Sequence, residues 1–186
     1  MTALELFKAS LKADSRVCLI GGTPEEYKAL SDYSVTTHSY AATGVKYEAA
    51  PQRPEMYDGI YCAHTLEHMR NVGSALDKMY SELKDNGLLC LVVPPAKHNI
   101  VGGHLTLWNA GLLVYNLIRA HFDCSKAAIR TYDYNVAILV RKRRADYDER
   151  TLKEDNGDIE TLAPYFPVPA HQDMDGRWAV HSWSPR

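Results

Sequence analysis

The sequence predicts an α/β fold: a doubly wound, mostly parallel sheet that helices cover on both faces, giving three α/β/α layers. Strand-like runs alternate with helix-like segments through the first three quarters of the chain, as parallel sheets require. The run LLCLVV at residues 88–93 is apolar without interruption and stops at two prolines, as a strand buried on both faces does. Two adjacent strand candidates near residue 135 predict that the sheet ends in a C-terminal antiparallel hairpin.

The first part of the chain contains two predicted helices and three candidate strands. Apolar residues between 4 and 11 have helical spacing, and we expect this helix to end near Asp14 and Ser15. The run RVCLIGG predicts a strand closed by glycines, and TPEEYKAL predicts a helix with Thr23 as N-cap and Pro24 in its first turn. The β-branched stretch SVTTHSY predicts a second strand, and TGVKYEA is a candidate for a brief third strand.

The second part continues the alternation. YDGIYCA at residues 57–63 predicts a strand, and apolar residues between 72 and 83 predict a helix that ends at the glycine of DNG, Gly87. After the buried strand at 88–93, Asn109 is a candidate N-cap for the helix AGLLVYNLIRAHF. The stretch AIRTYDYNVAILVRK then holds the two hairpin strands. In such a fold a ligand lies where the strands end, so we expect the turns after residues 20, 37, 62 and 93 to surround one crevice.

The composition changes near residue 145, which divides the chain into a domain of residues 1–145 and an extension of residues 146–186. The extension is acidic at first and then rich in proline and aromatic residues, and it lacks the apolar content for a core of its own. Two interpretations stay open. The extension packs over the domain, or its aromatic residues dock a protein partner or a second copy of the chain.

Overall composition narrows the classes of partner. The chain has 186 residues, 46% of them apolar, and a formal charge of −2, which gives no electrostatic argument for nucleic acid or for a membrane surface. Its four cysteines have no C-x-x-C spacing, so we expect free, buried thiols. Charged residues interrupt the N-terminal segment, which has no signal-peptide pattern and no membrane span, and we expect a cytoplasmic protein.

The motif His64-x-x-Glu67-His68 has the spacing of an inverted zinc-peptidase site. Such a site needs both histidines one turn apart on a helix and a third ligand from elsewhere. His64 follows an apolar strand directly, so we expect the motif to form a strand-to-helix turn and to hold no metal. Glu67 and His68 then begin the helix, cap it or contact a cofactor.

Residues 57–95, which contain this motif, resemble the middle of a class I S-adenosylmethionine-dependent methyltransferase. In that family the fourth strand enters an L-E-H turn, here Leu66–His68, and a helix follows, here near residues 73–85. A lysine-to-glycine turn, here Lys84–Gly87, leads to an apolar fifth strand that ends in proline. The stretch GGHLTLWNAGLLVYNLIRAHFD is similar to the next part of the family pattern, with His121 in place of a glycine. The resemblance covers about residues 15–142.

The resemblance implies a Rossmann-like methyltransferase fold, S-adenosylmethionine as cofactor, and a set of cofactor-binding positions. The glycine-rich turn of the family aligns on the turn after residue 20, and His38 or Ser39 stands where the family has the acid that binds the ribose. A glutamate in the following segment is expected at the adenine amino group, and His64 is expected to point into the crevice. The implied cofactor-binding residues are Gly21, Gly22, Thr23, His38, Glu48 and His64.

The resemblance also implies where methyl transfer takes place. The loop PPAKHNIVGGH lies where the family binds its acceptors, so His98 and His104 are the candidate bases, since histidine titrates nearest neutrality. By analogy the acceptor is a hydroxyl group of a small molecule or sugar. A second hypothesis is a methyltransferase-like binding or scaffold protein that has lost the donor site; Leu19, Thr23, Glu25 and His38, which depart from the family pattern, favour it.

Overall fold

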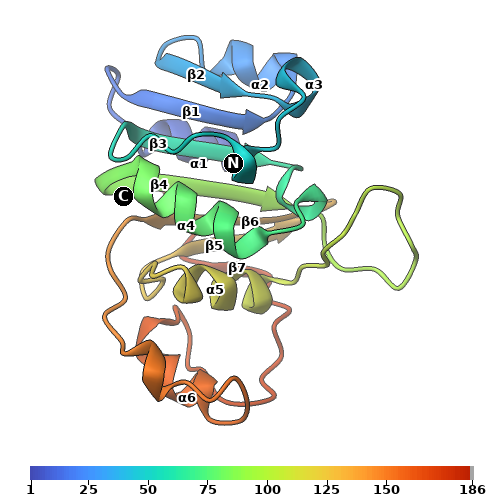
Figure 1. The fold of residues 1–186 in the computed structure, drawn as a ribbon, viewed down its shortest axis with the longest axis vertical. Coiled ribbons are helices and arrows are strands. Elements are labelled where there is room, and N and C mark those ends of the chain that lie inside the picture. Colours follow the sequence, from blue (N-terminus) through green and yellow to red (C-terminus); the bar gives the residue numbers. More distant parts are fainter. Residues whose placement is uncertain (185–186) are drawn as a thin grey trace.

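The computed structural model, which describes residues 1–184, contains one mixed sheet between two layers of helices. The strands are β1 (Arg16–Gly21), β2 (Ser34–His38), β3 (Tyr57–Ala63), β4 (Leu83–Val93), β5 (Ala128–Tyr132), β6 (Asn135–Arg141) and β7 (Val180–His181). The helices are α1 (Ala3–Ala9), α2 (Pro24–Ala29), α3 (Tyr40–Thr43), α4 (Val72–Glu82), α5 (Ala110–Arg119) and α6 (Asp158–Leu162). The strand order is β2-β1-β3-β4-β6-β5-β7 (Figure 1).

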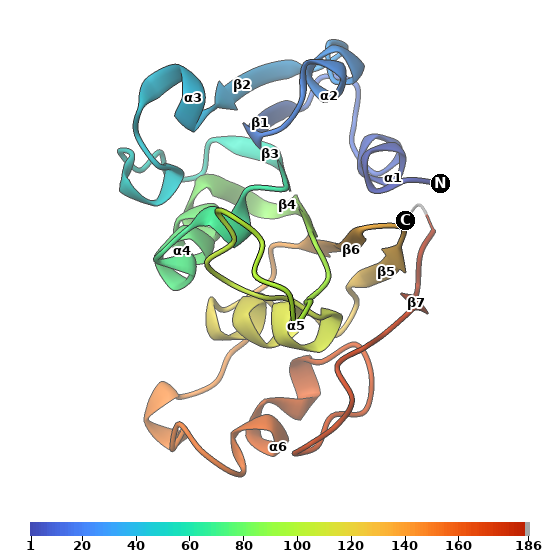
Figure 2. The same cartoon turned by 90° about the vertical axis from the view of Figure 1, so that its right-hand side faces the viewer.

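The predicted doubly wound sheet is confirmed. Strands β2, β1, β3 and β4 are parallel, and β5 and β6 form the predicted antiparallel hairpin beside β4. Figure 2 shows α1 on one side of the sheet and α4 and α5 on the other. Phe7 is fully buried under the first face, and Leu76 and Leu117 are fully buried under the second. The two cores on opposite faces are what a three-layer fold requires.

The helix caps that the sequence indicates are present. The Thr23 hydroxyl accepts from the backbone N–H of Glu26, and the Glu26 carboxylate accepts from the backbone N–H of Thr23, so this pair forms a complete capping box. The Asn109 side chain likewise accepts from the backbone N–H of Leu112 at the start of α5. Helix α1 ends at Ala9, about one turn before the expected end near Asp14.

The predicted third strand is wrong. The stretch 43–49 instead closes α3 at Gly44, which has a φ of +68°, and then forms a 3-10 turn at Tyr47–Ala49. The backbone oxygens of Tyr47 and Ala50 accept from the buried Lys78 ammonium rather than from a neighbouring strand. Because a side chain takes these acceptors, the segment folds against α4, and the sheet ends at β2.

The predicted end of α4 at Gly87 is also wrong. The helix stops at Glu82, and β4 begins at Leu83, which pairs with Tyr57. The DNG stretch is an irregularity inside β4: Asn86 has a φ of +60°, and the pairing with β3 shifts register between Tyr57 and Gly59. The backbones of Asn86 and Gly87 bond to Lys142, so contacts with the end of β6 decide this boundary.

The segment after residue 145 contacts the α5 side of the core and one edge of the sheet. Leu162 and Phe166 are buried in the same cluster as the α5 residues. Further on, β7 pairs antiparallel with β5, and the Trp183 indole donates to the backbone oxygen of Met1. Figure 1 shows α6 beyond α5, at the far end of the molecule from β2. None of the helices in residues 1–184 is long and apolar enough to cross a membrane.

Candidate functional site

A cavity of about 570 Å³ lies at the carboxyl ends of β1, β2 and β3. This is the point where the chain crosses from one side of β1 to the other, and the volume is within the range of small-molecule sites. We call this cavity the crevice. Its lining residues are Gly21, His38, Ser39, Tyr40, Ala41, Lys46, Tyr47, Glu48, His64, Thr65, His68, Met69, Arg70, Gly103 and Leu105.

The turn after β1 requires glycine at two successive positions. Gly21 has a φ of +69° and Gly22 a φ of +80°, in the left-handed region that favours glycine. A Cβ on Gly21 would overlap the Thr65 hydroxyl, so the close approach of this turn to the turn after β3 also depends on the missing side chain. Gly21 therefore lies in the crevice wall, whereas Gly22 and Thr23 continue into α2.

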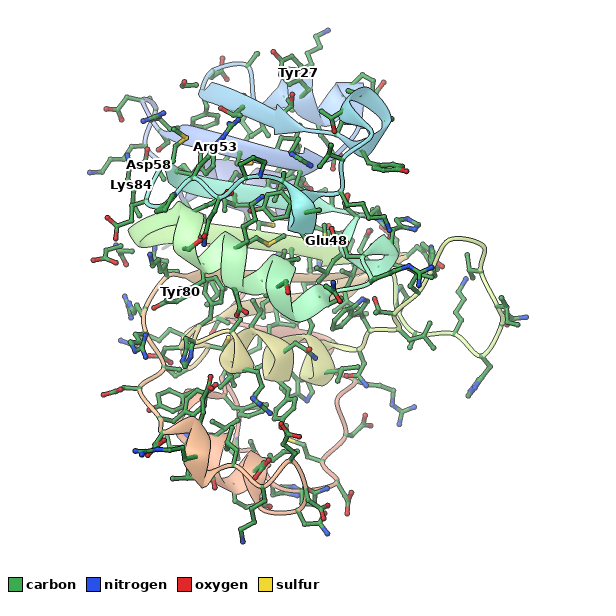
Figure 3. All side chains as sticks on the ribbon, in the orientation of Figure 1. Tyr27, Glu48, Arg53, Asp58, Tyr80 and Lys84 are labelled. Carbon is green, nitrogen blue, oxygen red and sulfur yellow. The ribbon has the colours of Figure 1, made fainter. Side chains whose placement is uncertain are left out.

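The second wall is the segment that carries Glu48, and one oxygen of this carboxylate is buried without a partner. The Oε2 atom of Glu48 is buried, yet it has no hydrogen bond to any residue in the range 1–184. Figure 3 shows Glu48 on the side where the parallel strands end, opposite Asp58 and Lys84. Because a buried polar atom normally has a partner, this oxygen is a ready acceptor for a donor group of a bound molecule.

His38, at the end of β2, is oriented by its surroundings. Its Nε2 lies 3.1 Å from the backbone oxygen of Val45, and its ring meets the edge of Tyr47 at 5.3 Å between ring centroids. Burial is the main influence that lowers the pKa of the His38 imidazole, so the neutral form is favoured. A neutral ring that donates through Nε2 keeps Nδ1 as an acceptor.

A buried ion pair on α4 holds the segment that carries Glu48. The Glu82 carboxylate accepts from the Tyr47 hydroxyl at 2.7 Å and from the backbone N–H of Arg53 at 3.1 Å. The Lys78 ammonium lies 3.8 Å from Glu82 Oε1 and donates to the backbone oxygens of Tyr47 and Ala50. Burial, reinforced by Glu82, raises the pKa of Tyr47, so its hydroxyl remains a donor. The position of this wall therefore depends on α4.

The third wall is the turn after β3. His64 adopts a φ of +47°, its backbone N–H donates to Val92, and its Nε2 lies 2.8 Å from Asn135 Oδ1 in the hairpin. The expected strand-to-helix turn is confirmed, because residues 66–68 form a 3-10 turn. The expectation that Glu67 and His68 begin or cap the helix is wrong, since α4 begins at Val72 with Asn71 as its N-cap.

A cluster of Glu67, His68 and His104 lies beside this wall, and we call it the Glu67 cluster. Glu67 is 1% exposed, and its Oε1 lies 3.6 Å from His68 Nε2. The His68 and His104 rings meet edge to face, with centroids 5.2 Å apart. The backbone oxygen of Glu67 accepts from the N–H groups of Leu105 and Thr106, which ties the loop after β4 to the L-E-H turn.

The structure brings four of the implied cofactor residues, Gly21, His38, Glu48 and His64, to the crevice. Of the two candidate bases, His104 contacts His68 beside the crevice, and His98 lies exposed on the loop after β4. Sequence reasoning missed Lys46 and Arg70, which add two cations to the lining. Arg70 could have been found from its position shortly after the strand predicted at residues 57–63, whereas Lys46 lies inside the stretch 43–49 that was predicted as a strand.

Comparisons with known proteins point to one family. A family model described as a methyltransferase domain matches residues 7–131. A search of curated protein sequences finds no match.

Solved structures with the same fold include three enzymes with low sequence identity. The 1,6-didemethyltoxoflavin-N1-methyltransferase of Burkholderia thailandensis, with 1,6-didemethyltoxoflavin and S-adenosylhomocysteine bound, has a TM-score of 0.62 at 14% identity, over 77% of each chain. A SAM-dependent methyltransferase from Archaeoglobus fulgidus has a TM-score of 0.57 at 14% identity, over 75% of this chain and 91% of that one. Phosphoethanolamine N-methyltransferase 2 of Haemonchus contortus, in complex with S-adenosyl-L-methionine, has a TM-score of 0.55 at 14% identity, over 69% of this chain and 37% of that one.

Proposed function

Because the chain belongs to the methyltransferase domain family and is an S-adenosylmethionine-dependent enzyme, we propose that it methylates a hydroxyl group of a small molecule or sugar. We place the methyl donor in the crevice at the ends of β1, β2 and β3. The observation that carries this placement is the buried Glu48 Oε2, which lacks a hydrogen-bond donor that a ligand in the crevice would supply.

The residues of the crevice fit the polar groups of the donor. Glu48 accepts from the adenine amino group, His38 offers one acceptor to the ribose, and the turn at Gly21 lets backbone approach the ligand closely. When bound, S-adenosylmethionine supplies a methyl group and leaves as S-adenosylhomocysteine with the electron pair of the broken carbon–sulfur bond. The acceptor hydroxyl must lose its proton as its oxygen bonds to the methyl carbon. We assign His104 as the base that takes this proton.

Replacing Glu48 with glutamine should weaken donor binding about 10- to 100-fold. A hydrogen bond to a charged group is worth roughly 1.5–3 kcal/mol, and about 1.4 kcal/mol corresponds to a tenfold change in affinity. Calorimetric titration with S-adenosylhomocysteine measures this change. The matched control is Glu25→Gln, since Glu25 is an exposed acid just after the glycine turn and does not line the crevice.

Equal affinities of wild type and Glu48→Gln would remove Glu48 from the donor site. If wild type gives neither heat nor a thermal shift with S-adenosylmethionine or S-adenosylhomocysteine at millimolar concentration, the crevice is not a donor site. That result would favour the second hypothesis, a methyltransferase-like binding or scaffold protein.

His104→Ala should lower turnover by about 100-fold or more without changing affinity for S-adenosylhomocysteine, because assistance to proton transfer is typically worth 10²–10⁴ in rate. Turnover is measured with labelled S-adenosylmethionine and an acceptor found by screening hydroxylated small molecules and sugars. His98→Ala is the comparison, and we expect a smaller loss because His98 is exposed on the same loop. Unchanged turnover in His104→Ala would exclude it from the reaction.

A further inference from the structure

The Glu67 cluster combines residues from two separate segments at one side of the crevice. Glu67 and His68 come from the turn after β3, and His104 comes from the loop after β4. One potential ligand atom from each residue lies within 4.8 Å of the other two. His68 also lines the crevice, so a ligand bound by the cluster would lie next to any molecule that binds in the crevice.

The hydrogen bonds of His68 and of the neighbouring His64 leave one ring nitrogen of each facing the Glu67 carboxylate. His68 Nδ1 lies 2.7 Å from the backbone oxygen of Gly103. A carbonyl oxygen can only accept, so Nδ1 carries a proton, and the other ring nitrogen, Nε2, faces Glu67 Oε1 at 3.6 Å. His64 repeats the pattern: its Nε2 bonds to Asn135 Oδ1, and its Nδ1 lies 3.8 Å from Glu67 Oε1.

One oxygen of this carboxylate has no partner. Glu67 is 1% exposed, and its Oε2 has no hydrogen bond within the described residues 1–184. A buried carboxylate oxygen without a partner is unfavourable. A cation bound by the carboxylate and by the neighbouring imidazole nitrogens would supply the missing partner.

We propose that Glu67, His68 and His104 bind one divalent first-row transition-metal ion. Imidazole ligands favour zinc, iron, nickel or copper over magnesium and calcium, which prefer oxygen. The hydrogen bond from His68 Nδ1 to Gly103 is the kind of outer contact that fixes a metal-binding histidine in the correct tautomer. Two ligand atoms about 2.1 Å from a tetrahedral metal are roughly 3.4 Å apart. The candidate ligand atoms now lie within 4.8 Å of one another, so binding requires the side chains to approach by up to about 1.4 Å.

Sequence reasoning set the metal aside because a peptidase site needs both histidines of the motif on one helix. The proposed site uses a different set, in which the third ligand is His104 and His64 contacts the same carboxylate without being needed as a ligand.

Three protein ligands leave positions open for water or for a substrate oxygen. A hydroxyl bound there would lose its proton to solvent water more readily, because a metal ion lowers the pKa of a bound oxygen. His104 would then act on the acceptor by holding the metal. This catalytic role rests on the proposed function, whereas metal binding itself does not.

The test is a metal titration of the full chain without an affinity tag, after treatment with a chelator. Calorimetry with Zn²⁺ should show one ion per chain, and Co²⁺ should give visible absorption bands of a site with nitrogen and oxygen ligands. In Glu67→Gln and in His104→Ala the affinity for Zn²⁺ should fall by more than about 100-fold. That is the upper end of the loss seen when only an outer contact to a metal ligand is removed.

His171→Ala is the matched control, because His171 is an exposed histidine in the C-terminal segment. The Zn²⁺ affinity of this variant should equal that of wild type. Circular dichroism checks that each variant is folded; His104 is half-buried on a loop, so His104→Ala keeps the test valid if Glu67→Gln does not fold. Two results would overturn the proposal: absence of stoichiometric Zn²⁺ in wild type, or a Zn²⁺ affinity in both cluster variants equal to that of wild type. The three residues would then be held together by their direct contacts alone.

Titration with S-adenosylhomocysteine on the same samples separates the two proposals. Zn²⁺ binding that depends on Glu67 and His104, without any binding of S-adenosylhomocysteine, would support the metal site and overturn the donor site. If the chain binds S-adenosylhomocysteine but does not bind Zn²⁺, the donor site is supported and the metal site is overturned.

Discussion

Replacing Glu82 with alanine should lower the free energy of unfolding by about 3–5 kcal/mol, the usual loss when one partner of a buried ion pair is removed. Glu82 is 3% exposed and Lys78 6% exposed, so the variant leaves an ammonium buried without its carboxylate. It also removes the acceptor of the Tyr47 hydroxyl and of the Arg53 backbone. Urea denaturation measures the loss, and donor affinity should fall as well because this network positions Glu48.

Lys84→Ala is the matched control, because it breaks an ion pair of better geometry in an exposed place. The Lys84 ammonium lies 2.7 Å from Asp58, and both side chains are partly exposed. Figure 3 shows this pair at the opposite end of the strands from Glu48. Exposed pairs contribute about 0–1 kcal/mol, so the expected change is small. If Glu82→Ala is no more destabilising than Lys84→Ala, the Lys78–Glu82 pair does not hold the crevice wall.

Gly21→Ala should destabilise the protein by about 2–5 kcal/mol and abolish donor binding. A residue with a Cβ at a φ of +69° costs roughly 1–2 kcal/mol, and overpacking against Thr65 costs roughly a further 1–3 kcal/mol. Thermal or urea unfolding measures the change in the free energy of unfolding, and titration with S-adenosylhomocysteine measures the loss of donor binding.

Gly44→Ala and a double variant separate the two causes. Gly44 has nearly the same φ, +68°, and a Cβ there would meet no atom within 4 Å, so Gly44→Ala should show the backbone strain alone. Thr65→Ala removes the hydroxyl that the new Cβ would overlap, so Gly21→Ala with Thr65→Ala should be less destabilised than the sum of the single variants. An additive result would mean that the close approach of these two turns is not what requires glycine at 21.

Local patterns in the sequence predicted most elements, and they failed where residues distant in the sequence bond to the segment. The capping box at Thr23 and the cap at Asn109 formed as expected, because each requires only residues within one turn. The stretch 43–49 has the composition of a strand, yet Lys78 takes its backbone acceptors and folds it against α4. The stretch DNG is typical of a helix end, yet Lys142 binds it within β4.

The sequence by itself determined the alternation of strands and helices, the glycine turn, the family and the side of the sheet where the crevice lies. These follow from periodicity, from caps and from the rule that parallel strands end at one edge. Only the tertiary structure decided that the Oε2 atom of Glu48 is buried without a partner and that Glu67, His68 and His104 meet. Both features depend on the paths of loops between elements. Long-range packing fixes those paths, whereas local preference leaves them open.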